Sequence, residues 1–128
     1  MSTAGIGVDV VDVARFSLAL ERHPRLLTRL FTDGECEDAA MRAERLAARF
    51  AAKEAVLKAL GVGIGVTSWR SIEVTRGDDG APSVTLHGAA LRLAQGRGIT
   101  GLHLSLSHTA TTAVAFCVAD GRGDADGR

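Results

Sequence analysis

Three charged side chains are the first candidates for chemistry in this sequence. Asp9 interrupts an apolar stretch, GIGVDVV, where an unpaired carboxylate beside buried valines would be costly. Glu54 and Lys58 lie four residues apart in RFAAKEAVLKALG, so a helix places them one turn apart, where they can point together into a cleft. Each also has a simpler interpretation: Asp9 caps the following helix, and Glu54 with Lys58 forms a surface pair worth about 0.3 kcal/mol. For Glu54 and Lys58, only a partner would decide between the two interpretations.

The stretch around the two helical residues is locally basic. Residues 42–58 hold five basic side chains and two acidic ones, although the whole chain has fifteen of each and no net charge. Such a surplus suits an anionic ligand, but a solvated helix face would have the same composition. The basic residues are Arg42, Arg45, Arg49, Lys53 and Lys58.

Two further patterns suggest phosphate contacts. Gly61, Gly63 and Gly65 resemble a phosphate-cradling loop, but they follow a helix C-terminus, whose dipole repels phosphate, and they lack the ending of a Walker loop. Ser107 and His108 end the alternating stretch LSLSH, where a hydroxyl and an imidazole could bind phosphate. Because adjacent strand residues point to opposite faces, they do not make a convincing nucleophile and base pair of a hydrolase.

Periodicity predicts the elements that carry these residues. A short strand at 6–10 opens the chain, and helices follow at 13–20 and 24–30. Thr32 or Asp33 caps a third helix, whose first turn is acidic. The longest helix runs from about residue 43 to residue 60, because an apolar stripe continues through it and Gly61 offers a stop.

The second half of the chain is predicted to be mostly strands. In order, it holds a glycine-rich loop at 61–68, strands at 71–76 and 82–88 joined by the turn GDDG, a helix at 89–95, and strands at 102–108 and 112–120. We therefore expect an α+β fold, a mostly antiparallel sheet packed on the long helix, in a single domain at 1–119. The polar tail 120–128 is expected to be disordered.

Composition limits the classes of function. At 128 residues, 46% of them hydrophobic, the chain has enough apolar side chains for one packed domain. Its zero net charge argues against nucleic acid or an anionic membrane as a partner, and no apolar run is long enough to span a membrane. Cys36 and Cys117 lack the spacing of a metal site, so we expect free thiols in the reducing cytoplasm.

Four motifs in order resemble the holo-[acyl-carrier-protein] synthases. They are GIGVDVVDVARF at 5–16, FTDGE at 31–35, RFAAKEAVLKALG at 49–61 and LSLSHT at 104–109. The resemblance implies the 4'-phosphopantetheinyl transferase fold. It also implies a Mg²⁺-dependent enzyme that moves 4'-phosphopantetheine from coenzyme A to a serine of an apo-acyl carrier protein, releasing adenosine 3',5'-bisphosphate.

The resemblance assigns roles to the three charged residues. Asp9 and Glu54 would hold Mg²⁺, and Lys58 would lie by the pyrophosphate of coenzyme A, so that Glu54 and Lys58 are the catalytic residues. Two carboxylates suffice for magnesium, since waters and phosphate oxygens complete its coordination. The base that takes the proton of the carrier serine stays open between a metal-oriented water and Glu54 itself.

Further contacts are implied by the same resemblance. Arg15 would meet the acidic carrier protein. The coenzyme A nucleotide would be contacted by Arg49, Gly61, Gly63, Gly65, Ser107, His108 and Thr109. Members of the family often carry a lysine after the glycine loop, whereas residues 66–68 here are Val-Thr-Ser. Since larger relatives contain two such halves, this single half would assemble as a homotrimer with active sites between subunits.

Two other classes of function compete with this enzyme. A non-catalytic module that binds coenzyme A or a carrier protein would keep the fold, but the joint presence of Asp9, Glu54 and Lys58 argues against it. A small structural protein with solvated charges explains each motif singly and does not explain their order. The motifs do not distinguish carriers of fatty acid, polyketide or peptide assembly.

Overall fold

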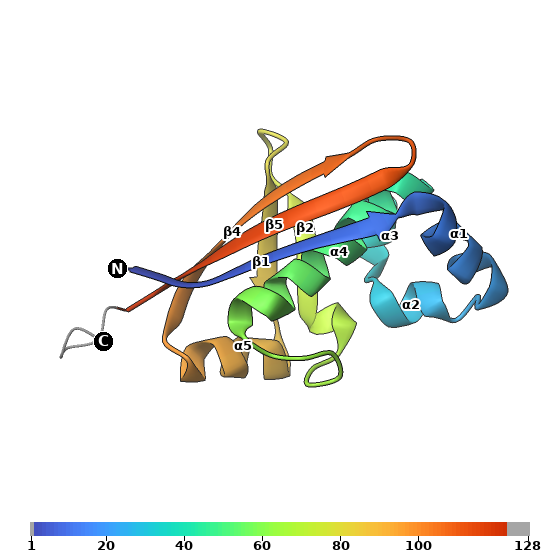
Figure 1. Ribbon diagram of the computed structural model, residues 1–128. Coiled ribbons are helices and arrows are strands. Elements are labelled where there is room, and N and C mark those ends of the chain that lie inside the picture. The colour runs from blue at the N-terminus through green and yellow to red at the C-terminus, as the bar shows by residue number, and fades with distance from the viewer. Residues whose placement is uncertain (1, 123–128) are drawn as a thin grey trace.

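The first strand, β1 (Ser2–Asp12), leads directly into a series of helices. The computed structural model describes residues 2–122 (Figure 1). After β1 come α1 (Val13–Arg22), α2 (Leu26–Leu30), α3 (Asp33–Asp38), α4 (Ala43–Leu60), the short 3-10 helix η1 (Trp69–Ser71), β2 (Ile72–Arg76), β3 (Pro82–Leu86), α5 (Gly88–Gly96), β4 (Ile99–His108) and β5 (Thr112–Gly121). This order, with antiparallel pairing throughout, confirms the α+β fold class.

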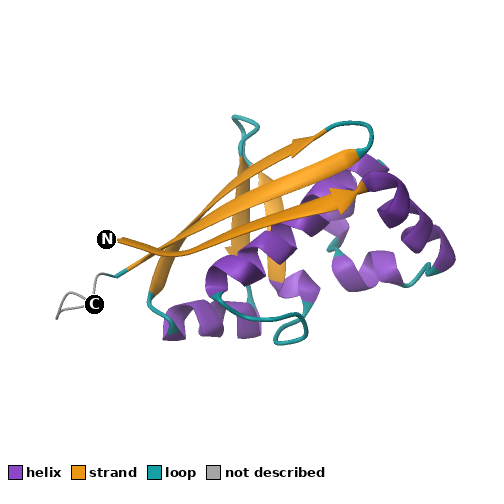
Figure 2. Ribbon diagram, in the orientation of Figure 1, coloured by secondary structure: helices purple, strands orange, loops and turns teal. Residues whose placement is uncertain are grey.

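The strands form two sheets. In the larger one β5 lies at the centre, in the order β1-β5-β4, while β2 and β3 make a separate hairpin that runs at an angle to it (Figure 2). Asp9 of β1 pairs with Ala115 of β5, which pairs with Leu106 of β4. Because side chains alternate along a strand, these three share the face that packs on α4, and Val8 and Phe116 share the opposite face.

Two glycines let β1 approach α4 at backbone distance. A Cβ atom at Gly5 would lie 1.9 Å from the carbonyl oxygen of Ala59, and a Cβ atom at Gly7 would lie 1.9 Å from that of Ala55. Neither distance is sterically possible, so both positions require glycine for this packing. The close approach brings Asp9, two residues after Gly7, against the next turns of α4.

Local signals end the helices as the sequence predicts. Gly61 has a φ of +76°, a conformation that suits glycine, and its N–H donates to the carbonyl of Lys58, which closes α4. At the start of α3, the Thr32 side chain accepts from the Glu35 N–H, and the Glu35 side chain accepts from the Thr32 N–H. This capping box gives α3 its start.

The larger sheet extends further than periodicity predicts. β1 begins at Ser2 instead of residue 6, β4 begins at Ile99 instead of residue 102, and β5 continues through Gly121. Irregular pairing at residues 3–5 and 99–101 breaks the alternation on which the prediction relied. Asp120 thus belongs to β5, as the predicted strand 112–120 has it, and so does Gly121, which was expected in the polar tail. The tail residues 123–128 lie outside the described residues.

A row of aromatic side chains links the helices at one end of the molecule. The Phe16 ring stacks on Phe50 with centroids 5.3 Å apart, and the Phe50 centroid lies 5.2 Å from that of Trp69. In the described part of the chain Cys36 and Cys117 are free thiols. None of the helices within residues 2–122 is long and apolar enough to cross a membrane.

Candidate active site

Asp9, Glu54 and Lys58 meet where β1 packs on α4. The Lys58 ammonium lies 3.3 Å from Asp9 Oδ1 and donates to the carbonyl oxygen of Val8 at 2.8 Å. The Lys58 side chain is 55% exposed and the Asp9 side chain 14% exposed. The cluster therefore has two partly buried carboxyl groups and a cation at the solvent boundary.

The two carboxyl groups of this cluster disfavour each other's charge. Burial, the charge of Asp9 and a hydrogen bond to Asp9 raise the pKa of Glu54 to about 7, although Lys58 opposes the shift. Two ionised carboxylates have only acceptors to offer, so their contact is a hydrogen bond only while one of them holds a proton. The second oxygen of Asp9, Oδ2, is buried and receives no hydrogen bond from any described residue. A cation shared by both groups would satisfy this oxygen.

The carboxyl groups of Asp9 and Glu54 suit magnesium better than they suit a metal that takes all of its ligands from protein. Within residues 2–122 no group of three or more His, Cys, Asp or Glu side chains is arranged to hold a metal. Magnesium is commonly held by one or two carboxylates plus waters and substrate phosphates. Asp9 with Glu54 supplies such a pair, with the orphaned oxygen turned inward.

The raised pKa of Glu54 predicts a pH-dependent stability in the absence of divalent cations. Between pH 4.5 and about 7 the folded protein holds this proton while the unfolded chain has lost it, so stability falls as the pH rises through that window. We expect a loss of about 1–2 kcal/mol, less than the full linkage value because solvent screens a half-buried group. Glu54→Gln, measured by denaturant unfolding at pH 5 and pH 8, should remove this component. An identical pH slope in both proteins would contradict the assignment.

Two hollows flank the cluster along the line where β1 packs on α4. One, of about 370 Å³, has Glu54 at its edge and Arg15, Asp12 and Phe50 in its lining. The other, of about 520 Å³, continues past Lys58 to Gly61. The charged residues thus stand between two open spaces, as a group that binds the middle of an elongated ligand would.

Three of the predicted contacts, Ser107, His108 and Thr109, are not brought to the cluster within one chain. Ser107 and His108 end β4, and β5 separates that strand from β1. Thr109 belongs to the turn after β4, where its hydroxyl accepts from the N–H groups of Thr111 and Thr112.

Arg49 is buried inside the molecule, whereas the glycines of the loop after α4 are open to solvent. Arg49 is buried, its guanidinium donates to the Arg45 carbonyl, and its Nε has no partner among the described residues. Burial and the charge of Arg76 lower the pKa of Arg49. Gly63 and Gly65 stand open, because a Cβ at either position would meet nothing within 4 Å.

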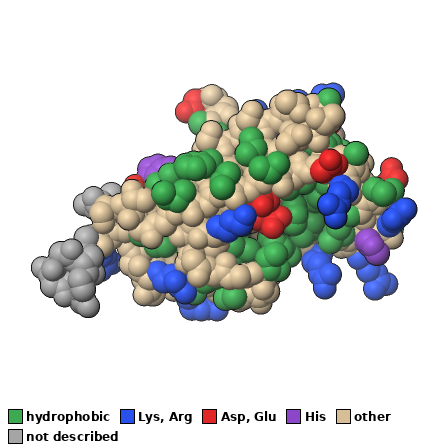
Figure 3. Space-filling view, in the orientation of Figure 1, with side chains coloured by type: hydrophobic (Ala, Val, Ile, Leu, Met, Phe, Trp, Pro, Cys, Tyr) green, Lys and Arg blue, Asp and Glu red, His purple; other side chains and the backbone are tan. Residues whose placement is uncertain are grey.

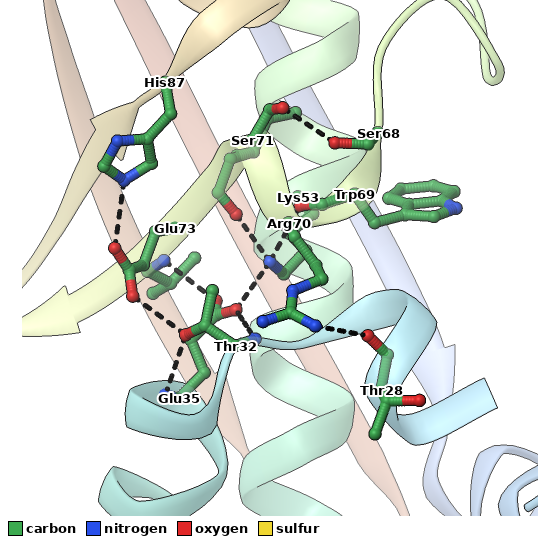
Figure 4. A network of polar contacts seen from close by, with 12 residues as sticks. Thr28, Thr32, Glu35, Lys53, Ser68, Trp69, Arg70, Ser71, Glu73 and His87 are labelled. Carbon is green, nitrogen blue, oxygen red and sulfur yellow. Dashed lines mark hydrogen bonds and ion pairs between the residues drawn. The ribbon is translucent and has the colours of Figure 1, made fainter. Parts of the chain in front are cut away.

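A buried ion pair that the motifs did not reveal joins Lys53 of α4 to Glu35 of α3 (Figure 4). Lys53 is fully buried and donates to Glu35 Oε1 at 2.8 Å, the Trp69 carbonyl at 3.0 Å and the Ile72 carbonyl at 2.5 Å. Burial lowers the pKa of Lys53, and Glu35 opposes that shift. In the sequence Lys53 looks like the other basic residues of its helix. The one signal for its partner was Glu35, the last residue of the motif FTDGE.

The same network joins four elements. The Val74 N–H donates to Glu35 Oε2 at 2.9 Å, the Thr32 hydroxyl donates to Glu73 Oε2 at 2.8 Å, and His87 lies 3.0 Å from Glu73 Oε1 (Figure 4). Through these contacts α3, α4, η1 and β2 are tied together. The network fixes the turn of α4 that carries Glu54 and the residues at which the loop 61–68 returns to the core.

Comparison with known proteins places this geometry in a family. A family model of the 4'-phosphopantetheinyl transferase superfamily matches residues 5–117. The holo-[acyl-carrier-protein] synthase of Clavibacter sepedonicus is 53% identical over 119 residues, covering 93% of this chain and 97% of that protein. That of Beutenbergia cavernae is 53% identical, covering 91% and 97%.

Solved structures agree. The holo-[acyl-carrier-protein] synthase of Neisseria meningitidis superposes with a TM-score of 0.84 at 32% identity, covering 92% of this chain and 98% of that one. The Helicobacter pylori enzyme in complex with coenzyme A superposes with a TM-score of 0.82 at 32% identity, covering 90% and 99%. The resemblance carried by the four motifs is confirmed. The chain belongs to the holo-[acyl-carrier-protein] synthase family of the 4'-phosphopantetheinyl transferase superfamily.

Proposed function

We propose that Asp9, Glu54 and Lys58 carry out the reaction of this family in the present chain, the transfer of 4'-phosphopantetheine from coenzyme A to a serine of an acyl carrier protein. The observation that carries the proposal is the joint placement of two mutually repelling carboxyl groups and one exposed ammonium group at the junction of two hollows. These three side chains suit a ligand such as coenzyme A, whose reactive pyrophosphate lies between the nucleotide and the pantetheine chain.

Asp9 and Glu54 would hold Mg²⁺, which when bound neutralises charge on the pyrophosphate oxygens. The serine hydroxyl gives its proton to a base, for which Glu54 and a bound water are the two candidates. The serine oxygen forms a bond to the pantetheine-side phosphorus, and the bond from that phosphorus to the bridging oxygen breaks, which releases adenosine 3',5'-bisphosphate. Lys58 would stabilise the negative charge that develops on the departing adenosine 3',5'-bisphosphate. The hydrogen bonds that Lys58 donates to the Val8 carbonyl and to Asp9 hold the ammonium beside the carboxylates.

Incubation with coenzyme A, Mg²⁺ and a panel of apo-carriers, read by intact mass, tests the function directly. We expect one carrier to gain one phosphopantetheine group per chain, and the panel to identify the pathway that it serves. A non-catalytic binding module would retain coenzyme A in a filtration assay while every carrier kept its mass. That outcome would replace the enzyme by the alternative.

Replacing Lys58 with alanine is expected to lower kcat more than it weakens coenzyme A binding. The ammonium is worth most when charge builds on the leaving group, so its loss falls mainly on the transition state, by about 2–3 kcal/mol. Lys58→Arg should rescue little, since a planar fork replaces a compact charge poorly. The measurement is kcat and KM for coenzyme A at saturating carrier. A rise in KM with kcat unchanged would assign Lys58 to ground-state binding.

The carrier protein is proposed to dock across α1 and α2. Arg15 lines the hollow that contains Glu54, and a second hollow of about 610 Å³ is lined by His23, Arg25, Leu26 and Arg29. Phe16 and Phe50 line an adjoining apolar hollow of about 630 Å³. A basic rim around an apolar recess complements an acidic partner that also presents an apolar side chain.

A homotrimer is proposed for the working enzyme because one face of the large sheet lacks cover in a single chain. Ile6, Val8 and Val10 of β1 and Phe116 of β5 all expose their side chains on that face. Hydrophobic side chains gather along the strand layer in Figure 3. Contiguous exposed apolar surface of this kind marks an interaction site, and closed symmetry would give each cluster the same neighbour.

Mixing two inactive variants tests the shared site. Glu54→Ala loses the metal pair and His108→Ala loses the strand end that a neighbour would supply. If the trimer is correct, complete exchange in an equimolar mixture of the two inactive proteins should restore up to about a quarter of wild-type activity, through sites that receive an intact half from each parent. Light scattering that reports monomers at assay concentration, or no recovery in mixed trimers, would refute the shared site.

A further inference from the structure

The outward face of the large sheet carries one charged pair beside its apolar surface. His103 Nε2 lies 2.5 Å from Asp120 Oδ2, and the two side chains are 65% and 26% exposed. His103 of β4 pairs with Val118 of β5, which pairs with Ile6 of β1. The charged pair therefore shares the face on which Ile6 is exposed, the face proposed above for packing between copies of the chain.

Other ionisable side chains are almost absent from this face. Along the strands β1, β4 and β5, the ionisable side chains that alternate onto it are His103, Asp120 and Asp12. Asp12 lies at the opposite end of the sheet, where it caps α1 by accepting a hydrogen bond from the Arg15 N–H. The charge of this end of the face is therefore set by His103 and Asp120.

Within residues 2–122, neighbouring segments supply no competing partner for the Asp120 carboxylate. The residues opposite Asp120 on the adjacent strands are Thr3 and Gly101, which are uncharged. Arg97 precedes β4 and Arg122 follows β5, but neither forms an ion pair with Asp120 in the part of the chain that the structure describes. The imidazole is thus the group that balances this carboxylate.

A second copy of the chain suits this face better than a charged partner does. The side chains of Ile6, Val8, Val10 and Phe116 are exposed on it, and its charged pair is satisfied internally. A strongly charged partner would find no counter-charge there, whereas a second copy presents the same uncharged surface. Packing of a second copy would shield the charged pair from water.

Shielding from water changes which protonation state of the pair is preferred. With the imidazole protonated, the pair has no net charge and makes a charge-assisted hydrogen bond. With the imidazole neutral, one negative charge stays on Asp120, and moving an uncompensated charge out of water is costly. Packing therefore favours the state that holds the proton, and every copy in a closed assembly adds one such pair.

We propose that the His103–Asp120 pair couples assembly of this chain to proton uptake, so that the assembly weakens as the pH rises. The inference rests on the homotrimer proposed above, and it concerns assembly rather than the reaction. Histidine is the side chain that ordinarily changes its charge between pH 5 and pH 8, which gives the window. Because association and proton uptake are linked, each proton taken up strengthens association by up to about tenfold per pH unit.

Sedimentation of the full chain at pH 6 and at pH 8.5 tests the coupling without any substrate. The wild-type concentration at which half of the chains are assembled should be at least about tenfold higher at pH 8.5. His103→Gln keeps a hydrogen-bond donor that cannot become charged, so this variant should assemble weakly at both pH values. Asp120→Asn removes the negative charge, so it should assemble at both.

His87→Gln is the matched control for the histidine variant. His87 also pairs with a carboxylate, that of Glu73 at 3.0 Å, but it precedes α5 and lies outside the large sheet. This variant should keep the wild-type pH dependence. Burial and the charge of Asp9 raise the pKa of Glu54 to about 7, so Glu54 titrates in the same range, and the variants at 103 and 120 identify the share of the pair.

Two results would overturn the coupling. One is an unchanged pH dependence in His103→Gln or in Asp120→Asn, and the other is a wild-type protein that is monomeric at both pH values. Transfer activity plays no part in the measurement. A protein that shows this pH-dependent assembly and modifies no carrier would refute the proposed function and leave the coupling intact.

Discussion

Replacing either Asp9 or Glu54 with alanine is expected to abolish phosphopantetheine transfer and leave the fold intact. Loss of one carboxylate removes half of the only protein donor set in the described cluster, and the associated stabilisation of the transition state is on the order of 4 kcal/mol, about a thousandfold in rate. The fold should survive because each change removes the repulsion between the two carboxyl groups in the protein without cation, where the charge of Asp9 helps to raise the pKa of Glu54.

The measurement is turnover at saturating Mg²⁺ together with thermal unfolding. Glu44→Ala is the matched control, because Glu44 lies on the same helix in a solvent-accessible pair with Arg42. It should keep both activity and unfolding temperature. Near-normal turnover of Asp9→Ala or Glu54→Ala would show that these carboxylates do not serve a metal.

Lys53→Met is expected to produce the largest loss of stability of any lysine substitution in α4. Lys53 has no exposed surface, and its removal leaves the Glu35 carboxylate buried with backbone donors but no counter-charge. Breaking one side of a buried ion pair costs about 3–5 kcal/mol of the free energy of unfolding. For a domain of this size that lowers the unfolding temperature by about 10 °C or more.

Two variants give this prediction its control. Lys58→Met removes a lysine whose side chain is 55% exposed, so the unfolding temperature should change by at most a few degrees. The double variant Glu35→Gln with Lys53→Met removes both charges and should recover part of the lost stability. Unfolding of Lys53→Met at the wild-type temperature would contradict the importance of the pair.

Local sequence determined much of the fold of this protein. The stop of α4 at Gly61 and the hairpin turn at 77–80 follow from glycines with positive φ, +76° at Gly61 and +81° at Gly80. The spacing of Glu54 and Lys58 by itself put both on one face of α4, because neighbours on a helix surface are set by its pitch. Features of this kind depend on residues close in the chain, so they can be predicted from it.

Tertiary structure alone decided which charges became buried and which met. Lys53 and Lys58 stand on one helix with similar sequence surroundings, yet one is enclosed by Glu35, Trp69 and Ile72 and the other faces solvent. Asp9 reaches Lys58 only because Gly5 and Gly7 admit the backbone of α4 at contact distance.

The same holds for the residues at the edges of the site. Arg97 lies against Gly61, thirty-six positions earlier in the chain, and β5 keeps Ser107 away from Asp9. Burial and proximity of this kind arise from packing between distant segments. When two backbones pack closely, as β1 and α4 do, several side chains are brought together at once. Helical pitch and strand alternation describe neighbours along the chain, so they carry no information on which distant segment will cover a given charge.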